Sequence, residues 1–137
     1  MDERFGKAYK LCSKKVIEEL FENGQKIKQY PFLLQYKHTD LPTKKSFQIV
    51  CSVPKRIHKK AVNRNRIKRL MRETVRKKKY ILEENFPQNE KQLALFLIYT
   101  GKSEESYSLL LDKIEKVFER LMNSKKEVNY KNEENKK

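Results

Sequence analysis

One amphipathic, strongly basic stretch between residues 61 and 79 constrains the fold of this chain more than any other. On an α-helix, at about 100° per residue, it separates into two faces. One face is mostly apolar and holds Ile67, Leu70, Met71, Thr74 and Val75. The other carries only cations and one amide, namely Asn65, Lys68, Arg69, Arg72, Arg76 and Lys79. Arg64 and Arg66 flank the boundary. The pattern predicts a helix that packs on a core and presents its charges outward.

The charge of the whole chain is concentrated around this helix. Residues 55–79 contain thirteen Lys or Arg and one acid, Glu73, so this stretch carries +12 of the chain's +15. A solvated helix face usually mixes signs, because like charges four residues apart cost about 0.2–0.5 kcal/mol. The concentration of one sign therefore favours a polyanion as partner, and nucleic acid over a plain solvated face.

The size and termini of the chain limit its class. Its 137 residues fit one domain, which we expect over residues 1–122, followed by a polar, charge-mixed tail at 123–137 that we expect to be disordered. No apolar run approaches the roughly 18–20 residues that a membrane span needs. The first residues lack the apolar segment of a secretory signal. We expect a cytoplasmic protein with no membrane partner.

The residues that usually carry chemistry are sparse. Cys12 and Cys51 lie far apart, and His38 and His58 do not complete a zinc-binding pattern with them. The three glycines are isolated, so no phosphate-binding loop is predicted. We expect no metal, no cofactor and no catalytic residue on the isolated chain.

Periodicity predicts the remaining elements. Residues 1–12 form a loosely ordered lead-in, and a first helix follows between an N-cap at Ser13 and a stop at Gly24. Strands are predicted at 26–30, 32–38, 47–53 and 93–100, the basic helix from 61 into the low 80s, and a last helix capped by Ser103. The basic helix thus joins two strands that can pair in parallel, in a small α/β (α+β) sandwich with a mixed sheet.

The segment Arg64-Asn65-Arg66-Ile67-Lys68-Arg69-Leu70-Met71-Arg72 resembles the signature R-N-R-x-K-R-x-x-R of the protein subunits of bacterial ribonuclease P, at every fixed position. Ser52-Val53-x-Lys55-Arg56 before it and Phe21-x-x-Gly24 near the start are also similar, and the resemblance covers roughly residues 8–122. It implies a two-layer α/β sandwich with an unusual left-handed strand–helix–strand crossover, like the second domain of a small-subunit ribosomal protein. The general expectation for such a crossover is right-handed.

The resemblance also implies a function. In that family an RNA is the catalytic subunit, and with bound Mg²⁺ it removes the 5′ leader from precursor tRNA. The protein binds this RNA and holds the single-stranded leader in a cleft between its first helix and the sheet. The implied partners of this chain are the catalytic RNA and the precursor tRNA leader, with Mg²⁺ bound mainly by the RNA and no obligate protein partner.

Site residues follow from the resemblance position by position. The RNA-binding set is Lys55, Arg56, Arg64, Asn65, Arg66, Lys68, Arg69 and Arg72. The leader-cleft set is Ile17, Phe21, Leu33 and Gln35, with Tyr36 as an alternative to Gln35. Ile17 and Gln35 depart from the family, which has aromatic residues at the first position and often at the second, so base stacking is expected to be weaker here or supplied by Tyr36.

Two other functions remain open at the level of sequence. A ribosomal or other nucleic-acid-binding protein, including a duplex-DNA binder with the cationic helix in a major groove, would have the same charge density. A protein-only nuclease would need clustered carboxylates to hold two metal ions. The acids here lie mostly in helix termini, the 83–90 connection and the tail, which disfavours the nuclease.

Overall fold

The computed structural model describes residues 6–84 and 91–135, with side chains up to Asn123. Its elements, in chain order, are the 3-10 helix η1 (Lys7–Tyr9), α1 (Lys14–Asn23), β1 (Gln25–Gln29), β2 (Phe32–His38), β3 (Phe47–Ser52), α2 (Ala61–Lys78), α3 (Tyr80–Glu84), β4 (Leu93–Tyr99) and α4 (Tyr107–Asn135). The strands and helices agree closely with the periodicity of the sequence, and the mixed α+β class is confirmed.

The sheet has the order β1-β2-β4-β3. β2 pairs antiparallel with β1 and with β4, whereas β3 pairs parallel with β4 from Phe47↔Leu93 to Ser52↔Ile98. The predicted parallel pairing of the two strands around the basic helix is thus confirmed. The apolar run of β4 takes a central position because strands flank it on both sides.

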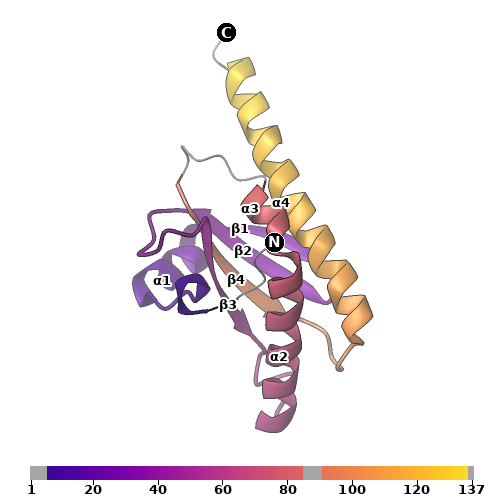
Figure 1. Ribbon diagram of the computed structural model, residues 1–137. Coiled ribbons are helices and arrows are strands. Elements are labelled where there is room, and N and C mark those ends of the chain that lie inside the picture. Colours follow the sequence, from indigo (N-terminus) through magenta and orange to yellow (C-terminus); the bar gives the residue numbers. More distant parts are fainter. Residues whose placement is uncertain (1–5, 85–90, 136–137) are drawn as a thin grey trace.

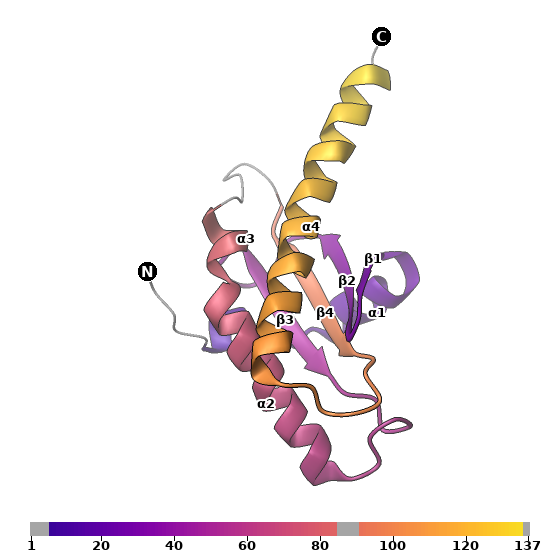
Figure 2. The ribbon, with the colours of Figure 1, turned by 90° about the vertical axis from the view of Figure 1, so that its right-hand side faces the viewer.

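The crossover from β3 through α2 to β4 is left-handed. In Figure 2, α2 lies between the viewer and the sheet, β3 and β4 both run downward, and β4 lies to the right of β3. A right-handed connection would place β4 on the other side of β3. The fold therefore has the handedness that the family resemblance implied.

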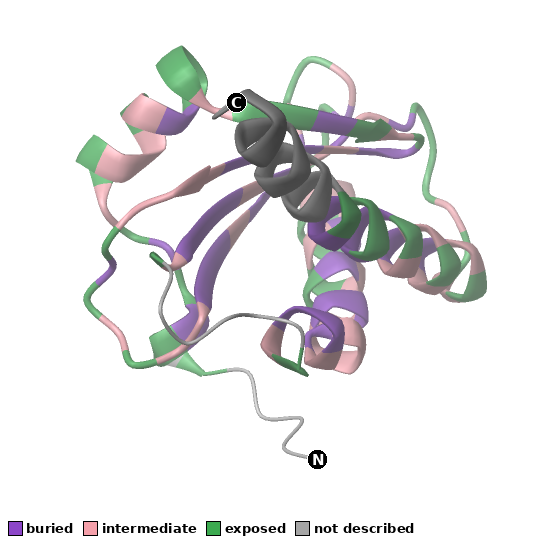
Figure 3. Cartoon of the chain, turned by 90° about the horizontal axis from the view of Figure 1, so that it is seen from above, coloured by how far each residue is buried: buried purple, intermediate pink, exposed green. Residues whose placement is uncertain are grey.

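Helices cover both faces of the sheet, with α1 on one face and α2, α3 and α4 on the other (Figure 1). The main core lies under α2 and α4, where Met71 and Val75 meet Ile114 and Phe118 over Leu95 of β4. A smaller cluster under α1 contains Leu11, Leu20, Leu41 and Ala94. Buried residues accordingly line the middle of the sheet and the helix sides turned toward it in Figure 3. The outer face of α2 is left uncovered.

The first helix begins and ends where the sequence predicted. The Ser13 side chain accepts a hydrogen bond from the Val16 N–H at 3.3 Å, which caps the helix start. At the other end Gly24 has an ordinary φ of −69°. Its need for glycine comes instead from close approach, because a Cβ there would lie 2.3 Å from the Leu20 carbonyl oxygen.

The expectation of a loosely ordered lead-in is wrong for residues 7–11. Tyr9 and Leu11 are buried, and the Leu11 N–H donates to the Ile49 carbonyl at 3.1 Å. Lys10 forms a parallel bridge with Ile49, so this segment covers part of the open edge of β3. This segment is ordered because two of its apolar side chains are buried and because it pairs with an otherwise open strand edge. Its basic composition gave no sign of either contact.

Two helix boundaries differ from the predictions. The basic helix is interrupted at Lys79, where the Leu82 N–H bonds to the carbonyl three residues back and tightens the turn. The last helix starts at Tyr107, where Ser106 rather than Ser103 accepts from the Leu109 N–H at 3.2 Å. α4 extends to Asn135 in the structure, beyond the expected domain end at 122, and disorder of residues 123–137 remains a prediction that nothing here tests.

Candidate nucleic-acid interface

The apolar face of α2 packs as predicted. Ile67, Met71, Thr74 and Val75 are buried, and Leu70 is half-buried against the main core. The Thr74 hydroxyl donates to the Met71 carbonyl at 2.7 Å, so this polar group is satisfied inside the core. The packing fixes the rotation of the helix and therefore turns its cationic side outward.

Three cations on that side have no internal partner. Within the described part of the chain, Lys68, Arg69 and Arg72 form no side-chain hydrogen bond and no ion pair. Asn65 beside them is exposed. Holding several uncompensated cations on one helix is unfavourable without an anion, so this face is suited to a polyanionic ligand.

The turn before α2 extends the same surface. Lys55 and Arg56 are both exposed. The turn is closed by the His58 N–H, which donates to the Pro54 carbonyl at 3.1 Å, and His58 itself is buried with its Nε2 2.7 Å from the Gly101 carbonyl oxygen. His58 is therefore an anchor of the loop, and the two cations project from a fixed turn.

Arg64 has a second role that the sequence did not indicate. Its Nη1 donates to the carbonyl oxygens of His58 at 3.0 Å and Lys59 at 2.8 Å. The guanidinium thus holds the basic turn against the start of α2. This signature residue organises the surface as well as adding charge to it.

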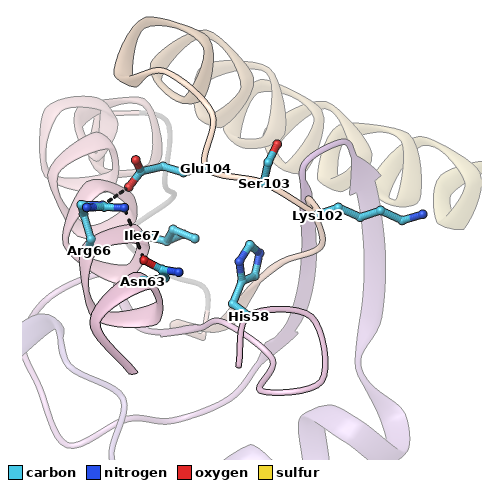
Figure 4. Close-up of a pocket in the computed structure, with 7 residues that line it drawn as sticks. All are labelled: His58, Asn63, Arg66, Ile67, Lys102, Ser103 and Glu104. Carbon is cyan, nitrogen blue, oxygen red and sulfur yellow. Dashed lines mark hydrogen bonds and ion pairs between the residues drawn. The ribbon is translucent and has the colours of Figure 1, made fainter. Parts of the chain in front are cut away.

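Arg66 is engaged differently. Its Nε donates to Oε1 of Glu104 at 2.7 Å, and its Nη2 lies 3.4 Å from Oδ1 of Asn63. Figure 4 shows the guanidinium between these two groups, at the edge of a depression that His58 and Ile67 also line. The Lys102 ammonium points away from Arg66 in the same view.

The C-terminal end of the basic stretch belongs to the body of the protein. Arg76 pairs with Glu73, and Lys78 lies 3.2 Å from Glu115 of α4. Lys79, predicted on the outward face, has an exposed fraction of only 1%. Its Nζ lies 4.9 Å from the centre of the Tyr9 ring and 3.5 Å from Glu83. Within the +12 stretch, the cations without a partner among the described residues therefore include Lys68, Arg69 and Arg72, whereas Arg76, Lys78 and Lys79 are internally paired.

The surface between α1 and the sheet contains four of the five predicted cleft residues. Ile17 is half-buried in the cluster under α1, and Phe21 is 55% exposed on the same helix. Leu33 and Gln35 alternate with the core-facing residues of β2 and therefore face α1.

Tyr36 does not belong to this surface, so its place in the cleft set was wrong. It lies in the main core on the opposite face of β2, where its hydroxyl donates to Oε1 of Gln25 at 2.7 Å. The two-residue period of a strand requires neighbours to face opposite sides. Gln35 is the residue on the α1 side; it is 4% exposed, and its Oε1 has no hydrogen-bond partner among the residues that the structure describes.

Sequence reasoning missed Phe96. This β4 residue is directly opposite Gln35 in the sheet and packs against Phe21, with ring centroids 4.9 Å apart in an edge-on arrangement. The side of β2 that faces α1 has no aromatic residue at Leu33 or Gln35, and the adjacent strand places Phe96 beside it. The alternation of L-A-L-F-L-I-Y placed Phe96 opposite the core-facing leucines and was the signal that could have found it.

The described residues contain no group of three or more His, Cys, Asp or Glu side chains that could hold a metal ion. Burial raises the pKa of the Cys51 thiol to about 12, although Arg72 and Lys68 nearby lower it. Cys51 is therefore a protonated core residue at the border of the cationic face.

Comparisons with known proteins agree with this geometry. The family model described as Ribonuclease P matches residues 5–122. A ribonuclease P protein component from Lactobacillus helveticus is 34% identical over 73 residues, which are 53% of this chain and 58% of that protein. The match therefore spans less than two thirds of that relative.

Solved structures share the fold. The ribonuclease P protein of Staphylococcus aureus has a TM-score of 0.63 at 19% identity, with 84% of this chain and 96% of that chain covered. The corresponding protein of Thermotoga maritima has a TM-score of 0.64 at 18% identity, with 81% and 96% covered.

Proposed function

This chain belongs to the ribonuclease P protein family, and we propose that it is the RNA-binding protein component of a ribonucleoprotein endoribonuclease. In this proposal a separate catalytic RNA removes the 5′ leader from precursor tRNA, and the protein binds that RNA. The observation that carries the proposal is the row of Lys68, Arg69 and Arg72, which lack partners among the described residues and lie on a face fixed by core packing. A phosphate backbone supplies the counter-charge that such a row requires.

The surface between α1 and the sheet is the proposed site of the single-stranded leader. Phe21 is exposed there, and Phe96 contacts its ring from β4. Aromatic faces bind unpaired bases by stacking, at about 1–3 kcal/mol per base, with little dependence on sequence. Leu33 and Ile17 add apolar surface, so this site favours contact with bases over contact with phosphates.

Cleavage itself is assigned to the RNA in this proposal, together with Mg²⁺ ions bound mainly by that RNA. A protein site for two-metal hydrolysis would need clustered carboxylates. The protein residues would bind and orient the two RNAs, and no protein partner is invoked. The proposed location is the cytoplasm. None of the helices in the described part of the chain has the length and apolar content needed to cross a bilayer.

The length of the leader tests the proposal. The protein is combined with the ribonuclease P RNA of its own genome, and binding of precursor tRNAs with leaders from zero to about ten nucleotides is measured. We expect affinity to rise over the first few leader nucleotides, because the cleft adds contacts. A ribosomal protein predicts no such gain, and cleavage by the protein alone would contradict the proposal.

Phe21→Ala identifies the surface responsible for the gain. This variant should lose most of the leader-dependent gain while binding mature tRNA as before, because it removes a stacking face. Tyr30→Ala is the matched control, since Tyr30 is an equally exposed aromatic (59%) outside the cluster under α1. Thermal unfolding of both variants checks that they remain folded. Equal losses in the two variants would exclude the α1 surface as the leader site.

A further inference from the structure

Arg66 differs from Lys68, Arg69 and Arg72 in having a carboxylate partner among the described residues. Its Nε donates to Oε1 of Glu104 at 2.7 Å. Lys68, Arg69 and Arg72 have no such partner in the described part of the chain. The signature therefore contains one guanidinium that is already neutralised, on a surface otherwise open to anions.

The position of Glu104 is fixed by the loop that carries it. The buried Tyr99 hydroxyl donates to the Ser103 carbonyl at 2.5 Å and accepts from the Glu105 N–H at 3.1 Å, which holds the backbone on both sides of Glu104. On the other side of the loop, the buried His58 ring lies 2.7 Å from the Gly101 carbonyl oxygen. A side chain 38 residues away in sequence is thus held next to α2 (Figure 4).

The pair lies where a ligand can reach it. The Arg66 side chain is 56% exposed and that of Glu104 35%. Asn63 holds Nη2 loosely from the other side, at 3.4 Å. An RNA phosphate that approaches this guanidinium meets the Glu104 carboxylate at the same place, so the two anions compete for one cation.

We propose that Glu104 is an internal competitor for an RNA phosphate at Arg66, and this inference rests on the proposed function of the surface. Binding then exchanges one ion pair for another at this residue, whereas at Lys68, Arg69 and Arg72 a phosphate meets an unpaired cation. The carboxylate lowers the affinity of the surface for RNA. Only an RNA that places a phosphate close enough to Arg66 to displace the Glu104 carboxylate gains the full contribution of this guanidinium to binding.

The expected effect is modest because the pair is exposed. Ion pairs of this kind differ from separated charges by about two- to fivefold in an equilibrium constant. Glu104→Gln keeps the size of the side chain and removes its charge. We expect this variant to bind the catalytic RNA about two- to fivefold more tightly than the parent chain.

A double-mutant cycle on the full chain separates competition from general repulsion. Glu104→Gln is made in the parent and in Arg66→Ala, and affinity is measured for the ribonuclease P RNA of the same genome. Glu105→Gln is the matched control, because it removes the same charge one residue away and the Glu105 carboxylate has no ion pair among the described residues. Thermal unfolding is recorded for every variant.

The proposal predicts that the gain from Glu104→Gln exceeds that from Glu105→Gln in the parent, and falls to the control value in Arg66→Ala. An equal gain in both backgrounds would reduce Glu104 to a source of general repulsion. A loss of affinity would make it a positioning residue for Arg66. Either result overturns the proposal.

The cycle is repeated on an unrelated transcript of equal length. Failure of the parent chain to prefer the catalytic RNA would count against the proposed function. The coupling between Arg66 and Glu104 would still be measured on the unrelated RNA, so the two failures are distinguishable.

Discussion

Residues of one chemical type have different roles along α2. Arg69 is exposed and has no side-chain partner in the described structure, whereas Arg64 donates to two backbone carbonyls of the preceding turn. Lys79, about two helical turns beyond Arg72, is buried against Tyr9. Charge alone therefore does not identify the residues that are available to a ligand. Availability depends on whether each cation already has a partner within the protein.

Alanine substitutions at Arg64 and Arg69 should differ in their effect on the free energy of unfolding. Arg64→Ala removes both hydrogen bonds to the turn and should lower the free energy of unfolding by about 1 kcal/mol, the usual net value for such bonds. Arg69→Ala should change it by less than about 0.5 kcal/mol. Urea unfolding at one pH and salt concentration measures both variants. A comparable loss in the two would mean that the contacts of Arg64 do not stabilise the folded state.

The sequence could not distinguish these arginines, because both occupy fixed positions of one motif. The difference arises from the turn at residues 54–58, which folds back so that its carbonyls face α2.

Tyr36 and Phe96 show that prediction from the sequence has the same limit in the sheet. Strand period placed each residue on a face, but which face α1 covers depends on the topology. That is why Gln35 and Tyr36 stayed alternatives until the fold was known.

At the scale of elements, apolar periodicity predicted almost every strand and helix because packing and period agree there. β2 has the bounds that alternation indicated, and β4 ends one residue early. The incorrect predictions concern the ends of helices and strands and the interruption of the basic helix. Ser103 is a good cap in isolation, but the Tyr99 hydroxyl takes its carbonyl, so α4 starts later. A side-chain-to-backbone contact that the helix pattern does not reveal thus accompanies the later start of α4.

Gly24 supports an element-scale prediction. A Cβ at this position would lie 2.3 Å from the Leu20 carbonyl oxygen, so Gly24→Ala must shift the end of α1. We expect a loss of about 1–3 kcal/mol in the free energy of unfolding, typical of overpacked sites. Gly6→Ala is the control, because nothing lies within 4 Å of a Cβ there. Denaturant unfolding compares them, and an unchanged Gly24→Ala would show that α1 ends without this constraint.

At the scale of the whole molecule, burial in the core lowers the reactivity of the side chains there. Burial raises the pKa of the Cys51 thiol to about 12, whereas Cys12 is exposed. Only the thiolate reacts readily with thiol reagents. At pH 8 we therefore expect Cys12 to be labelled quickly and Cys51 only as fast as the protein unfolds. Mass spectrometry of a labelling time course resolves the two sites. Labelling of both at one rate in native buffer would contradict the packing around β3.

Across the molecule, the cations of α2 differ in whether they have an acidic partner within the described structure. After Arg72, cations of α2 pair with nearby acids, as Arg76 does with Glu73 of the same helix and Lys78 with Glu115 of α4. In the first part, Lys68, Arg69 and Arg72 have no partner within residues 6–84 and 91–123, and α4 and the sheet pack against the opposite side of the helix. A rigid scaffold with an open cationic face binds a polyanion without having to reorganise first.

The most direct measurement compares two triple variants of the full chain for affinity to the ribonuclease P RNA across a salt series. Lys68→Ala/Arg69→Ala/Arg72→Ala and Arg76→Ala/Lys77→Ala/Lys78→Ala remove equal charge from one helix. The first should weaken binding strongly and reduce the slope of log K against log salt by about two to three units, close to one for each lost phosphate contact. The second should leave the slope nearly unchanged. Equal losses in affinity and slope would contradict the central claim, since total charge rather than the open face would then hold the RNA.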